Sequence, residues 1–166
     1  AHVVANPGVR GVMCTGSSDV ARIFARTLAD RLDDDGHTIP LIAETGGQNA
    51  MVVDSSALSE QVVFDVLSSA FDSAGQRCSA LRVLCVQEDN ADHVLTMLRG
   101  AMRELSVGNP DRLSVDVGPV IDTEARNGIQ RHIETMRTAG HRVDQVELNG
   151  ECRHGTFVPP TIIQID

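Results

Sequence analysis

Short apolar runs alternate with amphipathic helical patterns along most of this chain, and this alternation limits the possible folds more than any other feature. Apolar runs typical of buried strands occupy residues 9–14, 38–43, 49–53 and 81–86. Helical stripes separate the first run from the second and the third from the fourth. Strands that alternate with helices pair in parallel, because each helix returns the chain to the same end of the sheet. The sequence therefore predicts an α/β fold with a parallel sheet flanked by helices.

The first helical pattern covers residues 20–32, where apolar side chains recur at intervals of three and four. Ser17 or Ser18 is a good N-cap for this helix, and Gly36 can take the positive φ of a helix end. The strand, the Gly16-Ser17 turn and the helix start can together bind an anion, because unpaired N–H groups face outward there. A plain turn between a strand and a helix fits the same residues.

Three more helical patterns follow along the chain. The first covers residues 58–71, and the turn at residues 54–56 is a plausible cap for it. The second covers residues 91–105 and cannot continue through Pro110. The third covers residues 125–136 and is closed by Gly140. The tail at residues 156–165 has a strand pattern, although Pro159 and Pro160 are more typical of an edge or a loop.

Composition excludes several classes of function. The chain has 166 residues with a net charge of −9, and every basic residue is an arginine. Without lysine, neither Schiff-base chemistry nor a P-loop lysine is possible within this chain. No basic cluster offers a surface for nucleic acid, and no apolar run approaches the roughly 18 residues that cross a bilayer. We expect one ordinary aliphatic core, no nucleic-acid partner and no membrane span.

Four cysteines lie at positions 14, 78, 85 and 152, and no two of them have a CxxC spacing. This usage favours a reducing compartment, here the cytoplasm. The histidines near Cys152 have no standard zinc spacing, so we expect no metal site. The chain starts abruptly at Ala1 without a signal peptide, as a segment of a longer polypeptide would.

Glu44 and Cys78 form the most reactive pair of residue types in the sequence. Glu44 precedes Gly46-Gly47, and Cys78 follows Gly75-Gln76-Arg77, with a predicted helix between the two. A thiolate attacks an electrophilic carbon, and a carboxylate can take a proton from a thiol or from water. A strand-end carboxylate and a structural thiol are the simpler alternatives. If the pair is functional, folding must bring these two side chains to one cleft.

The sequence around these two residues resembles that of the aldehyde dehydrogenase superfamily. Glu-Thr-Gly-Gly at residue 44 and Gly-Gln-Arg-Cys-Ser at residue 75 are its motifs, and Gly-Asn-Pro, Gly-Pro-Val-Ile-Asp and Phe-Val-Pro-Pro-Thr-Ile follow in the family's order. The resemblance implies that Cys78 is the nucleophile and Glu44 the general base. It also implies the three-layer fold of that family, of which this chain holds part. Residues 1–43 are then the C-terminal part of the NAD-binding Rossmann-like domain, and residues 44–166 the N-terminal part of the catalytic domain.

The resemblance implies an NAD site as well. Met-Cys-Thr-Gly-Ser-Ser at residue 13 is similar to the family's Phe-Thr-Gly-Ser segment, which carries the dinucleotide pyrophosphate. Met13, Cys14 and Ala21 depart from the family pattern, so the resemblance implies that only Gly16 and Ser17 bind the pyrophosphate. Thr45 and Gly46, beside the general base, are the other expected NAD-binding residues. FAD is expected only if the parent chain also carries a proline dehydrogenase domain.

Ser79 points to one branch of the family. The segments around residues 43–50 and 72–82 are similar to enzymes that oxidise L-glutamate γ-semialdehyde, in which a serine at this place helps to hold the substrate carboxylate. The likeness is nearest to the 1-pyrroline-5-carboxylate dehydrogenase part of bifunctional proline-utilisation proteins. We therefore expect an aldehyde substrate, a role in proline catabolism and a parent that is a homo-oligomer.

Two alternatives remain open from the sequence. The chain can belong to a CoA-acylating dehydrogenase of the same fold, in which CoA rather than water receives the acyl group and Glu44 matters less. It can also be a folded or assembly module that keeps the motifs without using them. In either case we expect the chain alone to be inactive, because the family's oxyanion asparagine and ribose-binding glutamate are not among its residues.

Overall fold

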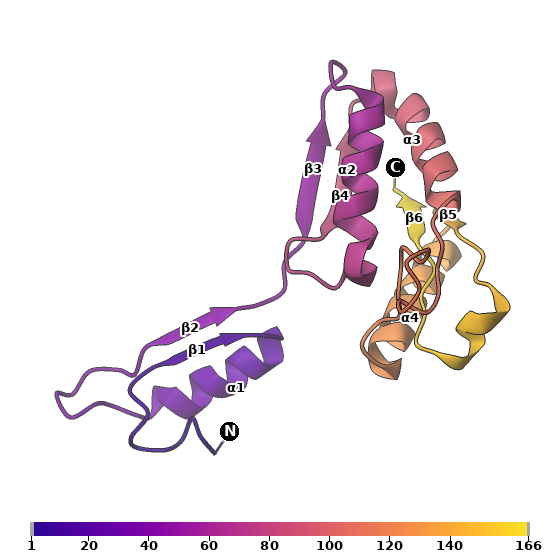
Figure 1. The fold of residues 1–166 in the computed structure, drawn as a ribbon. Helices are drawn as coiled ribbons and strands as arrows, with labels where there is room; N and C mark the ends of the chain where they lie inside the picture. Colours follow the sequence, from indigo (N-terminus) through magenta and orange to yellow (C-terminus); the bar gives the residue numbers. More distant parts are fainter. Residues whose placement is uncertain (1, 166) are drawn as a thin grey trace. The chain divides into compact units, whose positions relative to one another are not determined.

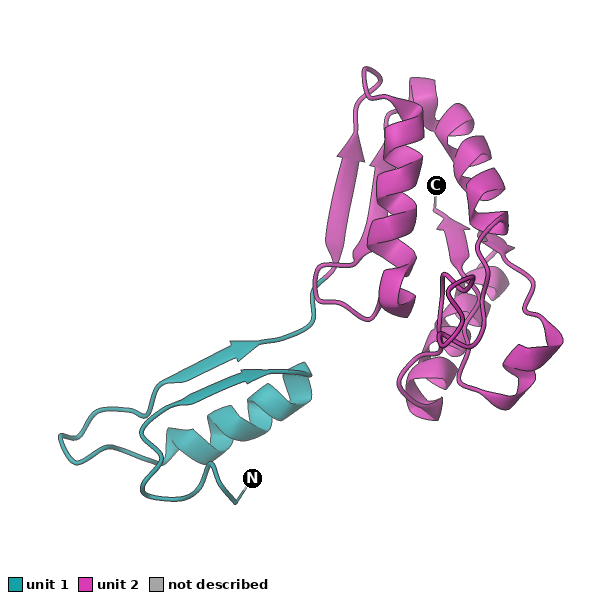
Figure 2. Ribbon diagram, viewed as in Figure 1, with its two compact units in different colours: residues 1–47 teal, residues 48–166 magenta. Residues whose placement is uncertain are grey.

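The computed structural model describes residues 2–165 and divides the chain into two compact units, Ala1–Gly47 and Gln48–Asp166 (Figures 1 and 2). The division lies four residues after the boundary expected from the sequence, between Gly47 and Gln48 rather than between Ala43 and Glu44. Glu44 therefore belongs to the first unit. The assignment of the two parts to an NAD-binding and a catalytic domain stays a prediction.

The first unit is a parallel strand pair covered by one helix. Strand β1 (Val12–Thr15) pairs with β2 (Leu41–Glu44), with Thr15 opposite Glu44, and α1 (Ser18–Ala29) lies along the pair in Figure 1. Alternate side chains of each strand face the helix, as the pleat of a strand requires. The small core of this unit consists of aliphatic residues and one phenylalanine: Val4, Val12, Phe24, Leu28, Ile39 and Leu41.

The start of α1 agrees with the prediction, but its end does not. Ser17 is the N-cap, and its Oγ accepts the Val20 N–H at 3.2 Å. The helix ends at Ala29, and Leu32 instead forms an isolated bridge with Thr38. Arg31 explains the early end, because its guanidinium donates to the carbonyls of Val4 and Val9 and draws the chain away from the helix axis. Gly36 has a φ of +82° but belongs to the following turn.

The second unit contains the larger core. Strand β3 (Asn49–Val53) pairs in parallel with β4 (Leu81–Val86), and both occupy the predicted residues. Helices α2 (Ser59–Phe71) and α3 (Glu88–Arg103) pack against this pair and each other. The seven buried residues at the contact are all aliphatic: Val53, Val62, Val63, Val66, Leu81, Val94 and Leu98. Burial of such side chains, at about 25 cal/mol per Å², holds the unit together.

The start of α2 corrects the sequence analysis. Its N-cap is Leu58, which has no side-chain hydrogen bond and is 68% exposed, so Leu58 is not a core residue. Asp54 instead closes its own turn by accepting the Ser56 N–H at 2.9 Å and the Ser56 hydroxyl at 2.6 Å. An aspartate that bonds two residues ahead makes a turn rather than a helix cap.

The remainder of the second unit joins a helix to an antiparallel strand pair. Asp122 caps α4 (Thr123–Thr138) by accepting the Ala125 N–H at 2.8 Å. Strand β5 (Arg142–Gln145) pairs with β6 (Thr161–Gln164), after which the described chain ends. The sequence analysis missed β5, because Arg142-Val143-Asp144-Gln145 has little apolar character. A half-buried ion pair of 2.7 Å between Arg99 on α3 and Asp144 attaches this pair to the core.

Within residues 2–165 the strands form three separate two-stranded sheets. Two are parallel, as the alternation of strands and helices predicts, and the third is antiparallel. Two short 3-10 helices, η1 (Asp72–Gly75) and η2 (Gly150–His154), complete the fold. None of the helices in these residues is both long and apolar enough to pass through a bilayer.

Candidate functional site

Cys78 lies in the turn between η1 and β4 and is exposed to solvent. Ser79 beside it is exposed too, whereas Ala80 is fully buried and Leu81 is 7% exposed. The chain thus passes from solvent to core within two residues. This arrangement presents the sulfur to a ligand from a backbone whose next residues are fixed by packing.

The backbone that leads to Cys78 is strained. Ser73, Ala74 and Gly75 all have positive φ, at 57°, 53° and 67°. Positive φ costs a residue other than glycine about 1–2 kcal/mol of stability, so a run of such residues persists only where the surrounding contacts impose it. At Gly75 a Cβ would lie 2.7 Å from the Ala70 carbonyl oxygen and 2.9 Å from an Arg82 nitrogen. Only glycine fits this position.

We expect Gly75→Ala to destabilise the second unit by about 2 kcal/mol or more, because it adds a left-handed penalty and a clash with the backbone. The matched control is Gly100→Ala, within α3, where a Cβ meets nothing within 4 Å. That change should stabilise by about 0.5–1 kcal/mol, because alanine favours a helix. Urea titration followed by circular dichroism measures both, and equal effects of the two changes would contradict the assignment of strain.

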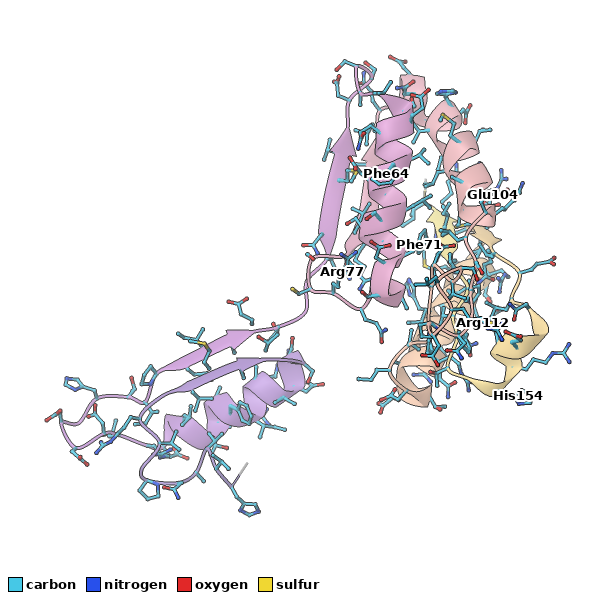
Figure 3. All side chains as sticks on the ribbon, viewed as in Figure 1. Phe64, Phe71, Arg77, Glu104, Arg112 and His154 are labelled. Carbon is cyan, nitrogen blue, oxygen red and sulfur yellow. The ribbon has the colours of Figure 1, made fainter. Side chains whose placement is uncertain are left out.

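Hydrogen bonds hold the cysteine turn from within the second unit. The Asn49 side-chain NH2 group donates to the Cys78 carbonyl at 2.7 Å and to the Ala80 carbonyl at 3.0 Å. Arg77 donates to the Ser68 and Ser69 carbonyls, at 2.7 and 3.2 Å, in the last turn of α2. Figure 3 shows Arg77 in the loop at this end of the helix, with Phe71 nearby on α2.

Gln76 connects the cysteine turn to a distant segment. Its side-chain oxygen accepts the Ile121 N–H at 2.7 Å, and its side-chain nitrogen lies 3.4 Å from the Pro119 carbonyl oxygen. The same nitrogen donates to the Ser73 carbonyl at 3.0 Å. One amide thus bonds both the strained run before Cys78 and a loop more than 40 residues further along the chain.

The motifs that the sequence analysis noted after Cys78 converge on this turn. Ala74 and Phe71 pack on a small cluster whose buried members are Val107, Val117 and Cys152. Gly108 of the Gly-Asn-Pro motif donates its N–H to the Val117 carbonyl at 3.1 Å. Val120 of the Gly-Pro-Val-Ile-Asp motif donates to the Thr156 carbonyl at 3.0 Å. Three segments far apart in sequence therefore form the support of the cysteine turn.

The predicted base and the predicted phosphate turn lie together in the first unit. Glu44 is the last residue of β2, and its carbonyl accepts the Gly16 N–H at 3.0 Å. Because β1 and β2 are parallel, their carboxyl ends meet at one edge of the sheet, where ligands of α/β proteins bind. Glu44 is exposed, Thr45 is half-buried and Gly46 is exposed. Cys78 belongs to the second unit, so its pairing with Glu44 stays a prediction.

The N-terminus of α1 fits a phosphate only in part. The Ser17 Oγ already caps the helix and the Gly16 N–H is bonded to Glu44, so neither of these groups is available to a ligand. The first N–H groups of the helix itself, from Ser18 and Asp19, have no intrahelical partner. They and the open space beside Gly16, where a Cβ would meet nothing within 4 Å, remain for a dinucleotide.

The other cysteines differ from Cys78 in exposure or in setting. Cys14 is half-buried in β1, and Cys85 is exposed on β4. Cys152 is buried in the cluster that supports the cysteine turn. Burial raises the pKa of the Cys152 thiol above its usual value, so this thiol stays protonated near neutral pH.

Among residues 2–165, one group of three His, Cys, Asp or Glu side chains lies close enough to hold a metal ion, and it does not include the histidines near Cys152. That trio consists of Asp33, Asp35 and His37, whose ligand atoms lie within 4.8 Å of one another. Asp33 Oδ1 accepts the N–H groups of Asp35 and His37, at 3.0 and 2.8 Å. A turn that closes on its own aspartate accounts for the proximity.

Comparison with known proteins identifies the family of this chain. The model of the aldehyde dehydrogenase family matches residues 1–165. The chain belongs to the aldehyde dehydrogenase family. The α/β fold of that family, predicted from the sequence, is also confirmed by a crystal structure of proline utilization A (PutA) from Bradyrhizobium japonicum. The two structures match with a TM-score of 0.88 and 49% sequence identity, and the match covers 97% of this chain and 16% of that chain.

Two curated relatives place this aldehyde dehydrogenase segment more narrowly. It is 63% identical to the bifunctional protein PutA of Klebsiella aerogenes, over the whole of this chain and 13% of that protein. It is 35% identical to the 1-pyrroline-5-carboxylate dehydrogenase of Bacillus mycoides, over 98% of this chain and 31% of that protein. The chain thus spans less than a third of the relatives' length. These likenesses confirm the predicted resemblance to the family and to its proline-utilisation branch.

The sequence analysis identified Cys78 and Glu44 from their motifs but did not find Gly75, Gln76 or Asn49 as parts of the site. Gly75 and Gln76 belong to the motif that leads to Cys78, and Asn49 is the first residue of a predicted strand, but none of the three was predicted to support the thiol. The contacts of Asn49 and Gln76 join segments that are 29 to 45 residues apart in sequence, which no local pattern indicates.

Proposed function

We propose that this segment supplies the thiol and the base for the NAD-dependent oxidation of L-glutamate γ-semialdehyde to L-glutamate, a step of proline catabolism. The observation that carries the proposal is the exposed Cys78 at the end of a strained, firmly bonded turn. Strain that surrounding contacts maintain is common where a catalytic group must be placed. The relationship to PutA and to 1-pyrroline-5-carboxylate dehydrogenase supports this choice of aldehyde.

The chemistry follows from the residue types. Glu44, directly or through a water, takes the proton of the Cys78 thiol, and the thiolate attacks the aldehyde carbon to form a thiohemiacetal. The Cys78 backbone N–H can donate to the oxygen that becomes negative. After oxidation the acyl group remains on sulfur as a thioester. Glu44, which has by then released its first proton to solvent, takes a proton from water, and the water attacks the thioester and releases the carboxylate product and the thiol.

Substrate and cofactor are held by neighbouring groups in this proposal. Ser79, exposed beside the nucleophile, hydrogen-bonds the substrate's own carboxylate. The N-terminus of α1 after Gly16 and Ser17, with Thr45 and Gly46, faces the dinucleotide. When bound, NAD supplies the hydride acceptor. FAD would be needed only by a separate proline dehydrogenase domain. A reducing compartment such as the cytoplasm suits this use of Cys78, because a nucleophilic thiol must stay reduced.

A hybrid enzyme tests the proposal. In it, this chain replaces its counterpart in PutA of Klebsiella aerogenes, which supplies the remainder of the longer polypeptide. We expect the hybrid to form NADH from L-glutamate γ-semialdehyde at a rate within about tenfold of unaltered PutA, whereas the isolated chain forms none. Absorbance at the NADH band measures both. A folded hybrid without activity, or NADH formation by the isolated chain, would contradict the proposal.

A further inference from the structure

Two side-chain amides bond the cysteine turn to other segments of the second unit. Asn49, at the start of β3, donates to the carbonyls of Cys78 and Ala80 at 2.7 and 3.0 Å. Gln76 bonds to the backbone of the loop around Ile121. Only Arg77, Cys78 and Ser79 lie between Gln76 and the buried Ala80.

The bonds of Gln76 are reciprocal, like those of a strand pair. Its oxygen accepts from the Ile121 N–H at 2.7 Å, while its nitrogen is oriented to the Pro119 carbonyl at 3.4 Å. The partner loop is itself fixed, because Val120 donates its N–H to the Thr156 carbonyl at 3.0 Å, and the Thr156 hydroxyl donates back to the Val120 carbonyl. Gln76 therefore connects the cysteine turn to a rigid support rather than to a free loop.

Asn49 acts on the nucleophile more directly. Its side-chain NH2 group has two hydrogens and donates to the carbonyl of Cys78 itself and to that of the residue two positions later. Fixing these two carbonyls fixes the peptide plane directly after Cys78 and the one directly after Ala80, and so restricts the direction in which the Cys78 Cα–Cβ bond leaves the backbone. Asn49 is held in turn by the sheet, because its strand pairs with β4 beginning at Leu81.

We propose that Asn49 and Gln76 are positioning residues that hold the Cys78 sulfur in its reactive orientation. Neither side chain reacts. Each restricts the conformation of the exposed turn, so that the thiol stays close to the geometry needed for attack. A displacement of about 1 Å at a reacting atom can cost about 100-fold in rate. This proposal rests on the role of Cys78 in the proposed function.

The test uses the cysteines of the chain as reporters. Iodoacetamide reacts with the folded chain, and peptide mass spectrometry follows each thiol across pH 6–9. Cys78 reports the site, exposed Cys85 is the internal reference, and buried Cys152, whose pKa is raised by burial, reports unfolding. In the unaltered chain we expect Cys78 to react about tenfold faster than Cys85.

The variants are Gln76→Met and Asn49→Leu, which keep the approximate size of each side chain but remove its hydrogen bonds. Each should reduce the Cys78 to Cys85 rate ratio about five- to tenfold and alter the pH profile of Cys78, while Cys152 stays protected. The controls Gln61→Met and Asn90→Leu should leave the ratio within twofold. Gln61 bonds only to Asp65 on its own helix, and Asn90 bonds to Ser55 away from the turn.

Two outcomes would overturn the positioning role. One is an unchanged ratio in both variants, and the other is a reduced ratio that appears only together with labelling of Cys152. Amide hydrogen exchange separates this proposal from the proposed function. If Cys78 is no faster than Cys85 in the unaltered chain, the proposed function fails. The positioning role then stands only if exchange at Ile121 and Ala80 rises about tenfold in the variants, and falls if that exchange is unchanged.

Discussion

Replacing Cys78 with serine should lower NADH formation by the hybrid enzyme by about 10⁴-fold or more. A serine hydroxyl is a much weaker nucleophile than a thiolate at neutral pH, and loss of a covalent nucleophile removes the whole reaction path that depends on it. Steady-state assays with saturating aldehyde and NAD measure the loss. The exposed position of residue 78 means that the change itself should leave the free energy of unfolding within about 0.5 kcal/mol.

The matched control is Cys85→Ser. Cys85 is also an exposed thiol of the second unit but lies on β4, beyond the turn. We expect this variant to keep its activity within about twofold. Retention of more than a tenth of the activity by Cys78→Ser, or an equal loss in both variants, would remove Cys78 from the mechanism.

Replacing Glu44 with glutamine should lower the steady-state rate by about 10²–10⁴-fold, the usual contribution of a general base. Glutamine keeps the size and exposure of the side chain but cannot accept a proton. Glu44 pairs with the β1 strand through its backbone, so the fold of the first unit does not depend on its carboxylate. Rapid mixing should show whether one equivalent of NADH forms before the slow phase, as expected when hydrolysis of the thioester is the step most impaired.

Glu60→Gln is the control for charge removal, because Glu60 is an exposed carboxylate in the first turn of α2. Its rate should stay within about twofold. Glu44→Gln with a steady-state rate within threefold of the unaltered hybrid would exclude the role of base. If CoA accelerates that variant and the product is an acyl-CoA, the chain instead belongs with the CoA-acylating dehydrogenases.

The strands of the larger core could be predicted from the sequence with correct ends. The residues of β3 and β4 are mostly apolar, apart from Asn49 and Arg82, and polar turns bound both runs, a pattern typical of short strands. The end of α1 could not be predicted from the sequence. The apolar spacing continues to Leu32, whereas Arg31 forms hydrogen bonds with carbonyls more than 20 residues earlier. Periodicity describes which face is apolar and contains no information about such distant partners.

The candidate site shows the same division. Cys78 and Glu44 are candidates because the sequence around them is characteristic of a family that is confirmed, and their roles stay predictions. The left-handed run before Cys78 could not be predicted, since Ser73 and Ala74 rarely adopt positive φ and only the surrounding contacts impose it. The amides of Asn49 and Gln76 are equally common residue types whose importance appears only when their distant partners are known.

The short distance along the chain between the exposed sulfur and the fully buried Ala80 has a practical consequence. A bulky group attached to residue 78 would extend into water, and the methyl group two positions later would keep its place in the interior. Fluorophores, spin labels or cross-linkers could therefore be carried at this position without loosening the molecule.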